Sequence, residues 1–148
     1  MGRLFKFIYV GVLLFIIIII SVFSYIQIYK SYTRIIDTNW SIKLPNSYKK
    51  IYYMDSGASF HGDGERYTVL KYTKEDNINK SVNWKNVKDK SIETEINKVL
   101  STLNVPIENM PNFQSNYKYY TIVKDDSSKI YLLFFNDTEK LYVIEDIY

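Results

Sequence analysis

A long uninterrupted apolar run opens the chain, and shorter alternating runs follow it. Residues 7–29 contain no charged side chain and include five consecutive isoleucines. About 20 apolar residues in a helix cross the hydrocarbon core of a bilayer, so this run predicts a single transmembrane helix that contacts membrane lipid. Tyr9, Tyr25 and Tyr29 lie near its two ends, where tyrosines commonly meet the membrane interface.

A cleaved signal peptide is the alternative for this segment. Residues 22–24 (VFS) have small side chains at the spacing of a cleavage site. The apolar run is longer than the core of a signal peptide and continues past that site, which favours an uncleaved anchor.

The orientation of the apolar run in the membrane depends on the charges that flank it. Arg3 and Lys6 precede it and Lys30 and Arg34 follow it, so the positive-inside comparison is nearly tied. A short basic flank before an apolar run is the usual start of an exported protein. We therefore expect residues 1–34 to form a cytoplasmic tip, a single-pass membrane anchor and a short flank, with residues 35–148 outside the cytoplasm.

The polar and apolar pattern after residue 35 has mainly the period of strands. Trp40, Ile42 and Leu44 alternate with polar residues, which predicts a strand over residues 39–45. The last third of the chain predicts three strands in a meander. Residues 130–135 are apolar on both faces, which is typical of the middle strand of such a meander. Runs rich in β-branched and aromatic residues predict the remaining strands at 47–55, 65–72, 117–124 and 140–148.

One segment has the period of a helix. Apolar residues at helical spacing form a single stripe within residues 87–103, made of Ile92, Ile96, Val99, Leu100 and Leu103. One helix among several hairpin-connected strands predicts an α+β domain, in which an antiparallel sheet has this helix packed across one face.

Composition and charge narrow the possible functions. The chain has 148 residues and no cysteine, so disulfides, thiolate metal sites and a cysteine nucleophile are excluded. Its net charge is +3, but fifteen basic residues and sixteen acidic residues lie from residue 35 onward, a net of −1. The domain therefore lacks the excess positive charge of a nucleic-acid-binding protein.

The candidate site is the segment 60–65 (FHGDGE) with the following Arg66. In an extended chain His61, Asp63 and Glu65 would point the same way, and such a set could bind Zn²⁺ or Mn²⁺. Asp63 and Gly64 also form a favoured two-residue hairpin turn, which would pair His61 with Arg66 and Phe60 with the residue after Arg66. The turn directs Glu65 away from His61, so the two interpretations exclude each other, and we favour the hairpin.

Other chemistry has weaker signals. The two glycines of the GDG segment lack the third glycine, the lysine and the helix of a phosphate-binding loop. His61 is the only histidine, and no serine lies in a G-x-S-x-G turn. We therefore predict no catalytic residues and no cofactor, and we assign Phe60, His61, Asp63, Glu65 and Arg66 to binding.

The FHGDGE segment, after an N-terminal anchor and a Leu44-Pro45 pair, resembles small uncharacterised membrane-anchored proteins of low-GC Gram-positive bacteria. The resemblance covers about a quarter of the chain. It implies an exported domain and transfers no catalytic residue.

These features favour a membrane-tethered binding or accessory protein over an enzyme. Its partner would be a protein, peptide or envelope component at the outer face of the cell membrane, and an immunity-like or inhibitory role belongs to this class. The alternatives are a metal-dependent hydrolase that uses the His61 loop and a structural subunit of a membrane complex.

Overall fold

The computed structural model of the chain describes residues 2–29, 31–57, 59, 62–73 and 78–148; in the first helix it describes the side chains of Ile8 and of residues 10–22. The helices are α1 (Gly2–Tyr29), α2 (Tyr32–Trp40) and α4 (Lys90–Thr102), with short 3-10 turns η1 (Ile107–Asn109) and η2 (Asn136–Thr138). The strands are β1 (Tyr48–Asp55), β2 (Gly64–Tyr72), β3 (Lys118–Val123), β4 (Lys129–Phe135) and β5 (Lys140–Ile147).

The five strands form one antiparallel sheet in the order β1-β2-β5-β4-β3. The α+β class and the antiparallel sheet that the sequence predicts are confirmed. β4 lies between β3 and β5, as expected for a strand that is apolar on both faces. The centre of the whole sheet is β5, because β2 adds to its free edge and carries β1 with it.

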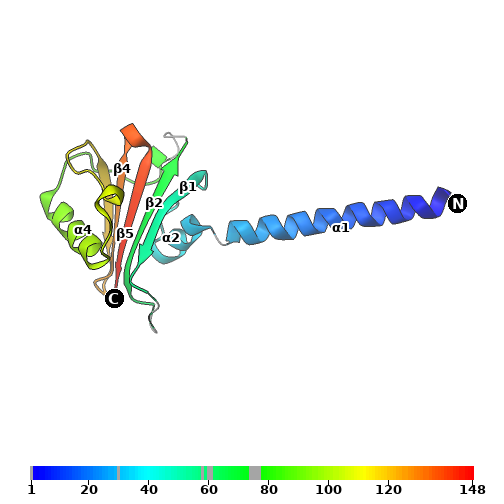
Figure 1. Ribbon diagram of the computed structural model, residues 1–148, viewed down its shortest axis with the longest axis horizontal. Helices are drawn as coiled ribbons and strands as arrows, with labels where there is room; N and C mark the ends of the chain where they lie inside the picture. Colours follow the sequence, from blue (N-terminus) through cyan, green and yellow to red (C-terminus); the bar gives the residue numbers. More distant parts are fainter. Residues whose placement is uncertain (1, 30, 58, 60–61, 74–77) are drawn as a thin grey trace.

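Helix α4 covers one face of the sheet, as the apolar stripe predicts (Figure 1). Ile96 and Leu100 are completely buried against aromatic side chains of β2, β4 and β5. The carboxylate of Asp89 caps the helix by accepting hydrogen bonds from the backbone N–H groups of Ser91 and Ile92. At the other end Asn104 takes a left-handed conformation, φ +53°, and Pro106 follows.

Helix α2 covers the opposite face and was not predicted. Its residues Ile36 and Trp40, four positions apart, are buried against the apolar side chains of β4 and β5. The strand predicted over residues 39–45 is wrong, because Trp40 ends this helix and Ser41 turns the chain with φ +55°. Ile42 and Leu44 still point into the core from an irregular segment, which explains their alternating pattern.

Helix α1 projects away from the domain (Figure 1). The side chains described along it, at Ile8 and residues 10–22, are all exposed. Taken over the residues that the structure describes, no helix is both long enough and apolar enough to cross a membrane. Helix α2 begins at Tyr32, three positions before the domain boundary expected at residue 35.

We expect Ile96→Ala and Leu100→Ala each to lower the free energy of unfolding by about 2–5 kcal/mol, since each removes a fully buried aliphatic side chain. Urea denaturation measures this change. Lys98→Ala on the exposed side of the same helix is the control and should shift stability by less than about 0.5 kcal/mol. Equal effects at the three positions would mean that α4 does not pack on the sheet.

Candidate functional site

A hollow of about 460 Å³ lies between α2 and the loop that joins β1 to β2. Tyr32 and Ile35 of α2 form one wall, and Tyr53 of β1 forms another. The remaining lining residues come from β1, the loop, β2 and β5, and they are Lys50, Asp55, Gly57, Ser59, Gly62, Asp63, Arg66 and Glu145. Three of these side chains are acidic and two are basic, which leaves the hollow with one excess negative charge.

Glu145 is the most unusual residue of this hollow, because it carries a carboxyl group and is only 1% exposed. Trp40 Nε1 donates a hydrogen bond of 2.7 Å to Glu145 Oε1, and the Tyr32 hydroxyl donates one of 3.3 Å to Oε2. Both donors are neutral and both come from α2. Among the residues that the structure describes, no Lys or Arg forms a salt bridge with Glu145.

The position of Glu145 follows from the two-residue period of β5. Leu141 and Val143 point to the α2 face, and Glu145 continues the same alternation. Arg66 is its direct cross-strand neighbour on β2, yet the Arg66 guanidinium donates a hydrogen bond of 2.8 Å to the Gly62 carbonyl oxygen. Glu145 thus has neutral hydrogen-bond donors and no salt bridge with a Lys or Arg of the described residues, so a cationic group that entered the hollow could pair with it.

The tyrosines around the hollow stay neutral at physiological pH. Burial, followed by the charge of Glu145, raises the pKa of Tyr32 well above its usual value. Burial, followed by the hydrogen bond to Asp55, raises the pKa of Tyr53 to about 12. The same hydrogen bond from Tyr53, and then one from the Gly57 N–H, lowers the pKa of Asp55. The hollow therefore offers neutral tyrosine hydroxyls beside the carboxylate of Asp55, whose pKa is lowered.

The loop between β1 and β2 differs from the hairpin that the sequence predicts. Asp63-Gly64 is not a two-residue turn, because Asp55 pairs with Arg66 and Met54 pairs with Tyr67. The expected pairs of His61 with Arg66 and of Phe60 with Tyr67 are therefore wrong. Gly64 is the first residue of β2, and its φ of +118° turns the chain from the loop into the strand.

The structure separates the residues that we assigned to binding. Asp63 and Arg66 line the hollow, whereas Glu65 shares the opposite face of β2 with the buried Tyr67. Phe60 and His61 lie outside the described residues. No group of three or more His, Asp or Glu side chains within the described part of the chain could hold a metal ion. The metal set of His61, Asp63 and Glu65 thus stays untested, since His61 is not among those residues.

Sequence analysis missed Tyr32, Trp40 and Glu145, which form the buried end of the site. A signal for Glu145 was present, because an acid stands at a core-facing position of the apolar run 141–145. Tyr32, Ile36 and Trp40 recur every fourth residue, which is the spacing of a helix face. The strand-like alternation of residues 40–44 concealed that signal.

We expect Glu145→Ala to destabilise the domain by about 1–3 kcal/mol, because the buried Trp40 indole N–H loses its acceptor. Glu145→Gln keeps an acceptor oxygen and should cost clearly less. Urea denaturation of both variants measures the difference. Equal losses would show that the carboxylate does not hold α2 on the sheet.

We expect Gly64→Ala to cost more than about 1 kcal/mol, for two reasons that a control can separate. A Cβ at Gly64 would overlap Ser56 Oγ, and φ is +118°. Gly62 also has a positive φ, +75°, but a Cβ there would meet nothing within 4 Å. Thermal or urea unfolding should therefore show a smaller loss for Gly62→Ala, and the reverse order would contradict the overlap.

Comparison of the chain with protein-family models, with curated proteins and with solved structures found no match in any of the three. The site is therefore argued from its own geometry.

Proposed function

We propose that the protein is a single-pass, membrane-anchored binding or accessory protein whose domain lies at the outer face of the cell membrane. The observation that carries the proposal is the buried carboxylate of Glu145, which lines the hollow and forms no salt bridge with any Lys or Arg that the structure describes. The ligand that suits this hollow is a basic side chain or amino group of a protein or peptide partner. An inhibitory or immunity-like role is one form of this function.

The anchor is supported by sequence and backbone together. Residues 7–29 carry no charge and lie within the 28-residue helix α1. The side chains described along α1, Ile8 and residues 10–22, are too few for a full span, whereas residues 7–29 of the sequence, as a helix at 1.5 Å per residue, would cover about 35 Å, against a hydrocarbon core of about 30 Å. The isoleucines and leucines of residues 10–22 are exposed, and lipid would bury them.

Two features support cation binding in the hollow. A positive group beside Glu145 would be attracted strongly, since water is largely excluded from a carboxylate that is 1% exposed. Tyr32 and Tyr53 already accept a cation over their rings, with Lys50 Nζ at 5.9 Å and 5.2 Å from the two centroids. An incoming ammonium or guanidinium group would replace Lys50 over these rings.

We expect the chain to bind short lysine-containing peptides, and Glu145→Gln to weaken this binding at least about tenfold because it removes the charge that the ligand meets. Isothermal titration with the peptides and with their lysine-acetylated forms measures the effect. Glu108→Gln, an exposed acid far from the hollow, is the matched control. Equal affinity for acetylated peptides, or no loss in Glu145→Gln, would contradict the proposal.

We expect protease added to intact spheroplasts to remove the domain and to leave the membrane-embedded anchor. Immunoblotting with a tag at each end of the chain follows the two parts. Protection of the domain until the cells are lysed would overturn the outward orientation.

One series of melting temperatures, with and without metal, distinguishes the metal-dependent hydrolase from the binding protein proposed here. Metal binding at the loop would raise the melting temperature with Zn²⁺ or Mn²⁺, and the rise would vanish in His61→Ala, Asp63→Ala and Glu65→Ala alike. We expect no such rise and almost unchanged stability in His61→Ala. A structural subunit, by contrast, would copurify with membrane proteins through residues 7–29 alone.

A further inference from the structure

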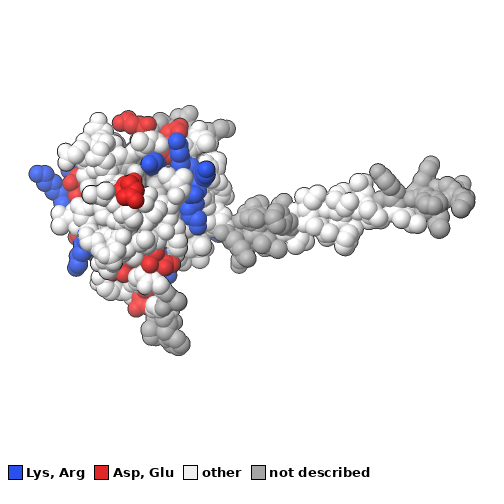
Figure 2. Space-filling model, in the orientation of Figure 1, with Lys and Arg blue, Asp and Glu red and all other residues white. Residues whose placement is uncertain are grey.

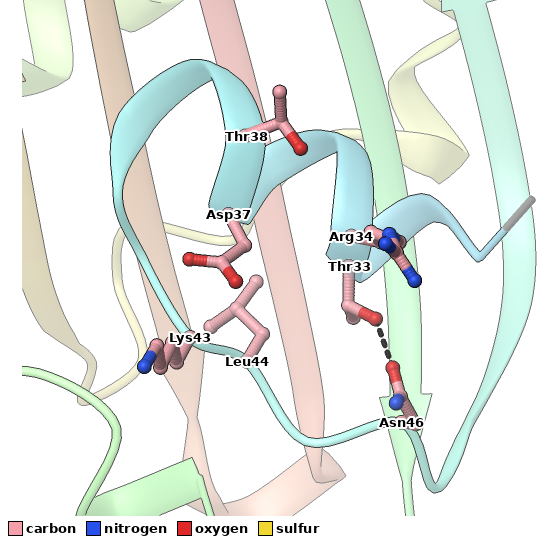
Figure 3. Close-up of a pocket in the computed structure, with 7 residues that line it drawn as sticks. All are labelled: Thr33, Arg34, Asp37, Thr38, Lys43, Leu44 and Asn46. Carbon is pink, nitrogen blue, oxygen red and sulfur yellow. Dashed lines mark hydrogen bonds between the residues drawn. The ribbon is translucent and has the colours of Figure 1, made fainter. Parts of the chain in front are cut away.

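A second hollow, of about 400 Å³, lies where α2 follows the end of α1 (Figure 3). Arg34 and Asp37 of α2 line one side, and Lys43 and Asn46 of the segment after α2 line the other. This hollow is separate from the one above Glu145, since the two share no lining residue.

The walls of this hollow are fixed by hydrogen bonds. Thr33 Oγ1 donates to Asn46 Oδ1, as the dashed line in Figure 3 shows. Ser31 Oγ donates to the same oxygen at 3.1 Å, and the Tyr32 N–H donates to the Tyr48 hydroxyl at 3.1 Å. These hydrogen bonds join the start of α2 to Asn46 and Tyr48 of the chain after it, close to the end of α1.

Charge is divided unevenly between this part of the chain and the rest. Residues 30–50 contain five basic residues and one acid, a net of 5 − 1 = +4. Residues 51–148 contain twelve basic and fifteen acidic residues, a net of 12 − 15 = −3. Figure 2 shows Lys and Arg side chains gathered on the side of the domain next to α1. The positive charge therefore faces the proposed membrane surface.

We infer that this hollow binds the phosphate of anionic phospholipid headgroups through Arg34 and Lys43. The inference rests on the proposed anchoring. Arg34 is only five positions beyond the last residue of α1, so its guanidinium lies at headgroup depth when α1 spans the bilayer. Lys49 and Lys50 of edge strand β1 are both exposed and point to opposite faces, so they add positive charge to this edge of the sheet without lining the hollow.

Asp37 would limit the affinity of the hollow for phosphate. Its removal therefore tests the inference in the direction opposite to removal of the basic groups. Its carboxylate lines the same space as Arg34 and Lys43 and repels a phosphate. Removal of this charge by Asp37→Asn should strengthen headgroup binding, whereas loss of the two basic groups should weaken it.

The full chain is reconstituted in nanodiscs of phosphatidylcholine alone and of phosphatidylcholine with phosphatidylglycerol, and hydrogen exchange of residues 31–50 is compared. We expect exchange to slow by about tenfold in the anionic discs, because each basic group adds to the attraction of the surface. The slowing should be lost in Arg34→Gln/Lys43→Gln and increased in Asp37→Asn. Lys90→Gln/Lys98→Gln on α4, the same change of charge on exposed residues, should retain it.

The outcomes separate the inference from the anchoring on which it rests. A chain that enters neither kind of disc contradicts the anchor. A chain that enters both discs and exchanges equally in them overturns the headgroup inference and leaves the anchor standing. Glycerol phosphate is added to the neutral discs as a third arm, and equal protection there would assign the hollow to soluble phosphate instead of lipid. Unchanged exchange in β4 and β5 verifies that each variant is folded.

Discussion

Burial of both faces of the sheet is the constraint on which the rest of this structure depends. Strands β4 and β5 carry apolar side chains on both sides, so a single covering helix would leave one row exposed to water. Helix α4 covers one face, and α2 with the segment after it covers the other. The first helix beyond α1 is therefore part of the core rather than a linker.

Helix α2 has nine residues, too few to be stable in isolation. Its apolar contacts through Ile36 and Trp40 hold it on the sheet, and the hydrogen bonds to Glu145 fix its orientation. A carboxylate among apolar neighbours is costly unless its oxygens are satisfied, and α2 satisfies one bond at each oxygen. In the described part of the chain no Lys or Arg forms a salt bridge with Glu145, which connects the packing of α2 to the chemistry of the hollow.

Local pattern was enough to predict most of the fold. The stripe from Ile92 to Leu103 specified α4, and β-branched runs with turn signals specified the strands. It failed at residues 40–44, where alternation in an irregular segment has the same period as a strand. It also failed at Asp63-Gly64, because the register of β1 on β2 is set by the contacts of Met54 and Tyr67 in the core and not by the favoured turn pair.

Only the loop residues of the site could be predicted from the sequence, because the other residues meet through contacts between distant parts of the chain. Asp63 and Arg66 were found from the loop sequence, since chemistry-bearing residues concentrate in loops. Tyr32 and Glu145 are 113 positions apart and meet only through the packing of α2 on the sheet. No local pattern contains a contact of that separation.

Only Lys30 and Ser31 separate the end of α1 from the start of α2. Two residues span at most about 7 Å, so under the proposed anchoring the domain would stay in a layer about as thick as itself above the bilayer. A partner that diffuses in the same bilayer would remain in that layer and be met at a high effective concentration even when its intrinsic affinity is weak, whereas a partner free in solution would gain no such advantage.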